Sequence, residues 1–348
     1  MLDRLFGLFS HDVGIDLGTA NTVVHVKGKG IVIREPSVVA RHKKTKQVLA
    51  IGNEAKKMLG KTPGTIEAIR PLRHGVIADF DAAEAMLQYY IKQVHEGPGI
   101  WPKVPRPRVV VGIPAGVTEV ERRAVQEAAL AAGARQAYLI EEPMAAAMGA
   151  GIPVELAEGH LIVDIGGGTS EIAVISLGGI VIEHSIRVAG DELDQAIVAF
   201  ARLKYNLVLG EMTAEAVKLA IGSAYPLEKE LKTVIRGRDL ETGLPKSLTV
   251  GSAEIREALA PTVRQIVTAI SETMEQTPPE LVADILQHGV TMAGGGSLLR
   301  GIDKLVAEEV KMPVWVTEDP MSAVVRGCAA VLENNILLHK VRVVGGLR

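Results

Sequence analysis

Two short segments of the chain each join an acid to a turn of small residues. Residues 13–22 read VGIDLGTANT and residues 162–171 read IVDIGGGTSE, so in both an apolar run leads to an aspartate and then to the turn. A tight turn of this kind after a strand exposes backbone N–H groups that can surround phosphate oxygens. One such turn is a weak signal. Two of them with matching aspartates predict that one polyphosphate is held from both sides.

The two aspartates, Asp16 and Asp164, stand at the same point of the shared pattern. In proteins Mg²⁺ is commonly held by one or two carboxylates, by water molecules and by the phosphates of a substrate. The pair therefore predicts a Mg²⁺ site beside the phosphates. The alternative is that each aspartate only caps its own turn, and the duplication favours the metal.

Two further groups could complete a nucleotide site. The run Gly294 to Ser297 stands between a predicted strand and a predicted helix over 297–309, where it could receive the nucleoside. Glu215 and Lys218 share one face of a predicted helix over 213–222. Such a pair is usually a solvated ion pair, although it could also clasp a ribose and cover a base.

Two adjacent acids, Glu141 and Glu142, precede Pro143 at the start of another predicted helix. Acids in this position often only complement the helix dipole. If this helix begins at a cleft between two domains, one of the acids could orient a water molecule at a terminal phosphate. Because adjacent side chains point in different directions, we expect only one of them to serve.

Other familiar site motifs are absent from the sequence. Gly60, Lys61 and Thr62 resemble the end of a P-loop, but Ala55 stands where the first glycine is required. No G-x-G-x-x-G run opens a helix after a strand, which argues against a dinucleotide enzyme. The histidines form no metal-like cluster, and no Ser–His–Asp set suggests itself.

The elements that must position these residues alternate between strands and helices in two similar halves. In the first half, a buried strand over 107–115 precedes a helix that Thr118 opens, with Glu121 completing a capping box. The second half restarts near residue 160 with three strands joined by glycine turns. This order predicts two α/β domains that face each other, each with an inserted lobe.

Composition agrees with a soluble two-domain protein. The chain has 348 residues, of which 47% are hydrophobic and 23% charged. Its net charge of -3 leaves no basic surface for nucleic acid. The single cysteine, Cys328, excludes an internal disulfide and lies in an apolar helical run, so we expect a buried structural thiol. We expect neither a membrane span nor a secretory signal.

The first residues carry an apolar stripe. Leu2, Leu5, Phe6 and Phe9 follow the i, i+3, i+4, i+7 spacing of one helix face. A segment this short does not form a stable helix alone in water. It is either a disordered tail or a strip packed on the body, or a helix lying in a membrane interface. One copy would bind a membrane weakly, whereas an array of copies would bind firmly.

The paired turns, together with IEEPMAAAMGAG and MAGGGSLLRG, resemble the actin/heat-shock-chaperone/sugar-kinase superfamily of ATPases. Within it the chain is similar almost end to end to the MreB family of bacterial actins, through GIDLGTANT, IRPLRHGVIADF, VDIGGGTSEIAVISLGGIV and AGDELDQAI. The resemblance implies an α/β actin-like fold in which two facing domains with smaller inserted lobes enclose a central nucleotide cleft. We place an amphipathic membrane-binding segment at 1–11, a first domain at 12–150 with a lobe near 34–74, a second domain at 151–318 with a lobe near 183–250, and a C-terminal helix and tail returning to the first domain at 319–348.

The resemblance also implies roles for single residues. It implies a first phosphate loop of Gly18, Thr19, Ala20 and Asn21, and a second of Gly166, Gly167, Gly168 and Thr169. It implies that Glu215 and Lys218 hold the ribose and adenine side, and that Gly294, Gly295, Gly296 and Ser297 close around the nucleoside. It implies that Glu142 positions the attacking water with help from Thr169, and that Asp16 and Asp164 hold Mg²⁺ mainly through its waters. Two positions depart from the family pattern: Ala220 where an acid is common, and Ser170 where a second threonine is usual.

The function that the resemblance implies is an ATP-hydrolysing cytoskeletal filament of identical subunits. It would be a cytoplasmic protein bound peripherally to the inner face of the cell membrane, where it organises cell-wall synthesis with membrane proteins of cell-wall elongation and maintains rod shape. The alternative is a metabolic kinase on the same fold. A kinase needs a base for a hydroxyl proton, usually an aspartate in the region where this chain has Glu142, and a sugar-binding set, which the sequence does not show. A chaperone ATPase would need a further substrate-binding domain, which we do not expect.

Overall fold

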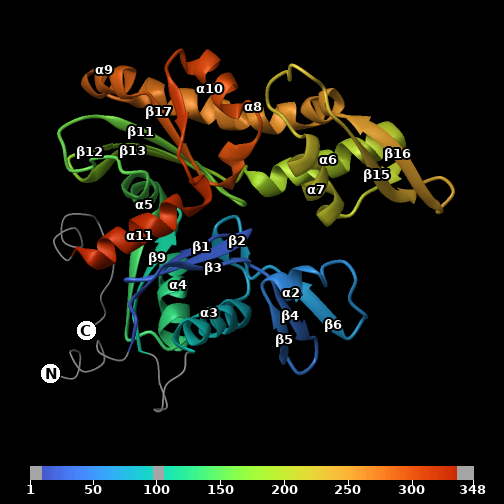
Figure 1. Ribbon diagram of the computed structural model, residues 1–348, viewed down its shortest axis with the longest axis horizontal. Coiled ribbons are helices and arrows are strands. Elements are labelled where there is room, and N and C mark those ends of the chain that lie inside the picture. Colours follow the sequence, from blue (N-terminus) through green and yellow to red (C-terminus); the bar gives the residue numbers. More distant parts are fainter. Residues whose placement is uncertain (1–9, 97–105, 335–348) are drawn as a thin grey trace.

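The computed structural model describes residues 10–96 and 106–334. Two α/β halves lie one above the other, and the helices α5 (Glu142–Gly149) and α11 (Ala323–Glu333) lie between them (Figure 1). The chain therefore has the two facing domains that the sequence predicts. The apolar stripe of Leu2, Leu5, Phe6 and Phe9 lies outside the described residues.

The first half is built on a five-stranded mixed sheet. Strand β1 pairs in parallel with β9 and antiparallel with β2. On one face lie α3 (Phe80–His95) and α4 (Glu119–Ala131), and α11 packs on the other. The predicted capping box of Thr118 and Glu121 at the start of α4 is confirmed. The strands, in spatial order, are β10 (Gln136–Glu141), β9 (Arg108–Ile113), β1 (Val13–Leu17), β2 (Asn21–Val26) and β3 (Gly30–Pro36).

The second half repeats this sheet with the same strand directions. Strand β11 pairs antiparallel with β12 and in parallel with β17, as β1 does with β2 and β9. The duplication in the sequence is thus a duplication of the fold. The strands, in spatial order, are β13 (Gly179–Ile186), β12 (Ser170–Ser176), β11 (His160–Ile165), β17 (Val290–Ala293) and β18 (Val314–Val316). The helices on the outer face are α8 (Ser252–Gln276), α9 (Pro279–His288) and α10 (Ile302–Val310).

Each half carries a smaller lobe, and both lobes lie on the same side of the molecule (Figure 1). The first lobe comprises β4 (Val39–His42), β5 (Val48–Ile51), β6 (Ile66–Ile69) and α2 (Asn53–Lys56), followed by the short strands β7 (Leu72–Arg73) and β8 (Val76–Ile77). The second lobe comprises α6 (Gly190–Tyr205), α7 (Glu211–Ile221), β14 (Leu207–Val208), β15 (Lys232–Asp239) and β16 (Pro245–Gly251).

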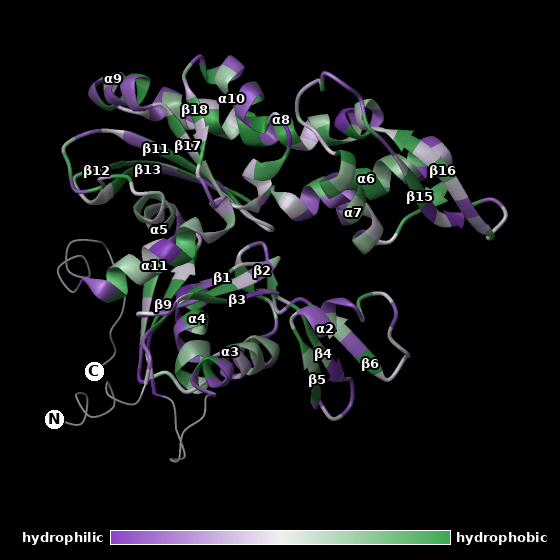
Figure 2. Ribbon diagram, in the orientation of Figure 1, coloured by the Kyte–Doolittle hydropathy of each residue, from purple (hydrophilic) through white to green (hydrophobic). Residues whose placement is uncertain are grey.

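The two large sheets form the centre of the core. Every residue of β11 and β12 is buried, because helices cover both faces of this sheet. The strands of the lobe hairpin β15–β16 are instead largely exposed and mix polar with apolar residues (Figure 2). In the described part of the chain, no helix is both long and apolar enough to cross a membrane.

The helices α5 and α11 approach each other as closely as two backbones can. A Cβ atom added to Gly149 would lie 1.8 Å from the carbonyl oxygen of Ala323, and one added to Gly327 would lie 1.9 Å from that of Ala145. Only glycine fits at both positions, because any larger side chain would push the helices apart. Cys328 is buried beside this crossing, as predicted, and its burial raises the pKa of the thiol well above the usual value.

Candidate functional site

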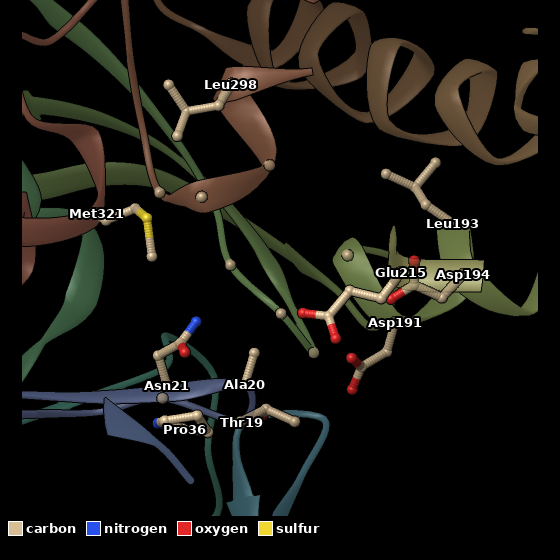
Figure 3. A pocket seen from close by; sticks show the side chains of 18 of the residues that line it. Thr19, Ala20, Asn21, Pro36, Asp191, Leu193, Asp194, Glu215, Leu298 and Met321 are labelled. Carbon is tan, nitrogen blue, oxygen red and sulfur yellow. The ribbon is translucent and has the colours of Figure 1, made fainter. Parts of the chain in front are cut away.

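A cavity of about 580 Å³ lies between the two halves. Figure 3 shows it with Thr19, Ala20 and Asn21 on one side and with Glu215 and Met321 reaching in from others. Its size is within the usual range for a small-molecule site. Sixteen of the residues singled out in the sequence line it: Asp16, Gly18, Thr19, Ala20, Asn21, Glu142, Asp164, Gly166, Gly167, Gly168, Thr169, Glu215, Lys218, Gly294, Gly295 and Gly296. Their individual roles stay predictions.

The two phosphate-type turns touch each other at the floor of this cavity. A Cβ atom on Gly167 would lie 2.5 Å from the Cβ atom of Ala20, and one on Gly168 would lie 2.6 Å from the Oγ1 atom of Thr19. The second turn is therefore glycine-rich because side chains of the first turn already occupy that space. Thr19 is held in turn by the Gly75 N–H group, which donates to its hydroxyl over 2.9 Å.

Four carboxyl groups gather below the turns. Burial and the charge of Asp164 raise the pKa of Asp16 to about 8, and burial raises that of Asp164 to about 7. Burial, then the charges of Glu171, Asp16 and Asp164, raise the pKa of Glu142 well above its usual value. Among the described residues, neither aspartate accepts a hydrogen bond from its own turn, so nothing supports the capping alternative.

This donor set fits a hard divalent cation. Clustered, poorly hydrated carboxylates are costly to ionise, and a bound cation offsets that cost. Oxygen donors are the ligands that Mg²⁺ prefers. The residues present are thus compatible with the Mg²⁺ site that the aspartates predict.

The side chains of the adjacent acids Glu141 and Glu142 point in different directions, as expected at the start of a helix. Glu142 lines the cavity from the first turn of α5. The Glu141 carboxylate instead has its Oε1 atom 3.9 Å from Nη2 of Arg122. Of the two, Glu142 is therefore the one placed to act on a ligand in the cavity.

Glu171 is a residue near the site that the sequence pattern did not indicate. Its side chain is 1% exposed and accepts hydrogen bonds from the Ala115 N–H group (3.1 Å) and the Ser185 hydroxyl (2.8 Å). Burial raises its pKa to about 7, although hydrogen bonds from Ser185 and Thr169 oppose the rise. Strand register places it directly opposite Asp164, whereas Val23 stands opposite Asp16. Extending the duplicated pattern by one residue beyond VGIDLGTANT would have exposed this difference.

Glu215 and Lys218 line the cavity but do not pair with each other in the described structure. Glu215 accepts from the Nζ atom of Lys56 over 2.8 Å, and Lys218 lies 2.9 Å from Oδ1 of Asp194. Lys218 also donates to the carbonyl oxygen of Gly190 over 2.7 Å. The i, i+3 ion pair, which was the alternative to a binding role for these two residues, does not form in the described structure, because each side chain finds a better-placed partner on another element.

Two ion pairs and one contact of a histidine with a glutamate join the first half to the second along the lobes. Lys56 meets Glu215, Arg70 meets Asp191 over 2.6 Å, and His74 lies 3.5 Å from Glu192. Asp191 and Glu215 both approach the cavity (Figure 3). The wall of the cavity is thus formed by charged contacts between the lobes.

The third glycine cluster packs on the second turn. A Cβ atom on Gly294 would lie 2.3 Å from the Oδ1 atom of Asp164. Ser297 is 3% exposed, donates to the Gly294 carbonyl oxygen over 2.7 Å, and is not among the described residues that line the cavity. The helix predicted from 297 begins only at Ile302, because a 3-10 turn precedes it and Gly301 adopts a left-handed conformation.

Comparison with known proteins decides the family. The model of the family described as MreB/Mbl protein matches residues 10–340. The chain belongs to this family.

Curated MreB/Mbl relatives match over nearly their whole length. The cell shape-determining protein MreB of Escherichia coli strain K12 is 52% identical over 337 residues, which are 96% of this chain and 96% of the relative. The cell shape-determining protein Mbl of Bacillus subtilis strain 168 is 49% identical over 333 residues, which are 96% and 99%.

Solved structures agree. The crystal structure of MreB5 of Spiroplasma citri bound to ADP has a TM-score of 0.88 at 40% identity and covers 95% of this chain and 98% of its own. The same protein bound to AMPPNP has a TM-score of 0.87. The MamK double helical filament, at 23% identity and a TM-score of 0.79, covers 93% of this chain and 99% of its own and shares the fold. The actin-like fold expected from the sequence is confirmed.

One expectation for this MreB/Mbl chain fails away from the cavity. The histidines were expected to form no metal-like cluster, yet His160 and His288 lie together with Glu158. The sequence hides this group because the two histidines are separated by most of the second half. None of the three lines the cavity between the halves.

Proposed function

We propose that this chain binds ATP with Mg²⁺ in the cavity between its halves, hydrolyses it, and assembles into membrane-associated filaments. The observation that carries the proposal is that both turns and both aspartates, one set from each half, line a single cavity. The ADP and AMPPNP complexes of Spiroplasma MreB5, at 40% identity, support a nucleotide in this place.

In this proposal the two turns bind the phosphates. The backbone N–H groups of residues 18–21 and 166–169 donate to the phosphate oxygens from opposite sides. Glu215 and Lys218 bind the ribose and adenine side, and Gly294 to Ser297 close around the nucleoside. Since Lys56 and Asp194 already hold Glu215 and Lys218, both side chains meet the nucleotide with little further ordering.

Asp16 and Asp164 hold the Mg²⁺ ion, mainly through its waters. When bound, the ion neutralises negative charge on the phosphates. A bound cation would lower the raised pKa values of the two aspartates and would favour their ionised forms.

Hydrolysis needs a water molecule aligned with the terminal phosphorus. Glu142 accepts a hydrogen bond from this water, whose oxygen forms the new bond to phosphorus while the bond to the bridging oxygen breaks. A carboxylate with a raised pKa is suited to receiving the proton that the water releases. Thr169 assists, and Glu171 keeps the Thr169 hydroxyl in place.

Filaments follow from head-to-tail contacts between identical subunits, which extend without closing. Bound ATP holds the two halves together and so favours assembly. Hydrolysis loosens the contact between the halves. Arrayed copies of the stripe of Leu2, Leu5, Phe6 and Phe9 attach the filament to the inner face of the cell membrane by avidity. The names of the curated relatives support a role in cell shape, which we assign to guidance of cell-wall synthesis with membrane proteins of cell-wall elongation.

Electron microscopy of the purified chain on a lipid monolayer tests the whole proposal. With Mg-ATP we expect filaments lying on the lipid, and without nucleotide we expect few. ATP binding without filaments under any condition would contradict the cytoskeletal role and return the chain to the kinase alternative, for which phosphate transfer to a small alcohol is the check.

A truncated chain separates the membrane role from assembly. Deletion of residues 2–9 should abolish co-sedimentation with liposomes, because it removes the four large apolar side chains of the stripe. Light scattering should show unchanged polymerisation. Unchanged lipid binding would show that the stripe is not the membrane anchor.

A further inference from the structure

Three ligand-type side chains meet at one end of the second half, away from the cavity. His160 begins β11, His288 ends α9, and Glu158 lies in the loop before β11. In Figure 1, α9 lies over this sheet at the side opposite the lobes. One ligand atom from each of the three residues lies within 4.8 Å of the others.

The distances in this group are close to those of a metal site. The Oε2 atom of Glu158 lies 3.6 Å from Nε2 of His288 and 4.0 Å from Nε2 of His160. Tetrahedral zinc with bonds near 2.0–2.2 Å places its ligand atoms roughly 3.3 Å apart. A contraction of up to about 1.5 Å, from at most 4.8 Å to about 3.3 Å, would bring all three onto one ion, and the half-exposed Glu158 and His288 side chains can provide it by changing rotamer.

His160 supplies the strongest indication that something is missing. Its side chain is 8% exposed, and its Nε2 atom is buried with no hydrogen-bond partner in the part of the chain that the structure describes. A buried polar atom without a partner destabilises the folded chain. A cation bound to the Nε2 lone pair would remove that cost.

Two hydrogen bonds of Gly159 connect this group to α9. Gly159 accepts a hydrogen bond from Nδ1 of His288 through its carbonyl oxygen over 3.3 Å, and its N–H group donates to Oδ2 of Asp284 over 2.8 Å. A hydrogen bond from Nδ1 leaves the Nε2 lone pair free, which is the arrangement usual for metal-bound histidine. Burial, followed by the charge of the neighbouring His288, lowers the pKa of His160.

We propose that Glu158, His160 and His288 form a binding site for one zinc ion, outside the nucleotide cavity. Two imidazoles and one carboxylate suit Zn²⁺, and water completes the fourth position on the exposed side. The rings now stack with centroids 4.5 Å apart and planes 17° apart, so His288 must turn about its side-chain bonds to aim its lone pair at the ion. The bound ion ties the end of α9 to the start of β11.

Calorimetric titration of the full chain with Zn²⁺ alone tests this site. The buffer contains a millimolar excess of Mg²⁺ and no nucleotide, so that the carboxylates of the cavity do not compete. We expect one zinc ion per chain, and at least about tenfold weaker binding in Glu158→Gln and in His288→Gln. The same affinity in His288→Gln as in the unchanged chain, or no binding in the unchanged chain, would overturn the proposal.

His184→Gln is the matched control. His184 also faces a glutamate, with Nδ1 3.9 Å from Oε2 of Glu272, but this pair has no second imidazole. Its replacement should leave zinc affinity unchanged. A loss equal to that of His288→Gln would show unspecific binding to surface histidines and would contradict the proposal.

Two more measurements test zinc binding separately from nucleotide binding. Co²⁺ in place of zinc should give the strong visible absorption of a four-coordinate ion in the unchanged chain and not in His288→Gln. Zinc should raise the unfolding temperature of the unchanged chain only. ATP affinity should be equal in both chains, so a failure of the zinc site and a failure of the nucleotide site are told apart.

Discussion

The two halves use the same pair of strands and the same turn, but they differ at the residue opposite the aspartate. Val23 stands opposite Asp16 on β2, and Glu171 stands opposite Asp164 on β12. The turns differ too, because side chains of Thr19 and Ala20 fill the space that the glycines of the second turn leave open.

The comparison teaches that duplication of a fold does not imply duplication of chemistry. The first half offers one aspartate beside an apolar strand. The second half adds a buried acid that contacts Thr169 and, through its partner Ala115, also the first half. We infer that the second half adds an acid, Glu171, that holds Thr169 beside the water which Glu142, from the first half, positions.

The largest effect should come from Glu142, whose pKa is raised partly by Glu171. Glu142→Gln keeps the shape of the side chain and removes its ability to accept a proton. We expect ATP hydrolysis to slow about 100-fold with ATP affinity unchanged, as measured by phosphate release and by equilibrium binding. If Glu142→Gln hydrolyses ATP at the rate of the unchanged chain, these acids take no part in the mechanism.

The contact between the turns should give the next effect. Gly167→Ala places a methyl group against Ala20, so the turns must separate and ATP affinity should fall about 30-fold, or about 2 kcal/mol. Ala20→Gly in the same chain should restore most of the loss. If the double variant binds ATP no better than Gly167→Ala, the turns do not act through this contact.

Glu171 and Val23 test the difference between the halves directly. Glu171→Gln should slow hydrolysis about tenfold and leave ATP affinity unchanged, because Thr169 loses a charged acceptor. The change Val23→Thr puts a hydroxyl at the equivalent position and leaves the contact between Glu171 and Thr169 in place, so it should alter the rate less than about twofold. Equal effects on the two rates would mean that the halves contribute alike.

The smallest effects concern the lysines of the lobes. Lys218→Met leaves Asp194 buried without its partner and should lower the free energy of unfolding by about 1 kcal/mol, because Asp194, with a pKa of about 6, takes up a proton instead. Lys56→Met breaks a more exposed pair and should cost about 0.5 kcal/mol. Urea unfolding measures both, and a larger loss in Lys56→Met would reverse this ranking.

The features that the sequence predicted correctly depend on residues that are close together in the chain. The capping box at Thr118, the burial of Cys328 and the repeated acid-then-glycine turns each depend on a few positions, and the structure places them as expected. The missed features depend on partners far apart in the chain. Lys56 and Glu215 are 159 positions apart, and no local pattern links them.

Glu171 was missed for a different reason. It lies in a strand whose every residue is buried, where a carboxylate is unexpected and the apolar pattern dominates. The helix predicted from residue 297 begins later, at Ile302, because Gly301 adopts a left-handed conformation that a helix cannot contain. The sequence does not show this, because a glycine can adopt either hand.

The tight crossing of α5 and α11 has a mechanical consequence. Each helix begins at the cavity, with Glu142 in the first turn of one and Val324 in that of the other. The part of α11 beyond Gly327 is six residues, or about 9 Å, long, so a tilt of about 5° about Gly327 moves its far end by about 0.8 Å. We infer that, with Gly149 and Gly327 as the fulcrum, α11 is a lever arm that carries a small displacement at the cavity to its far end.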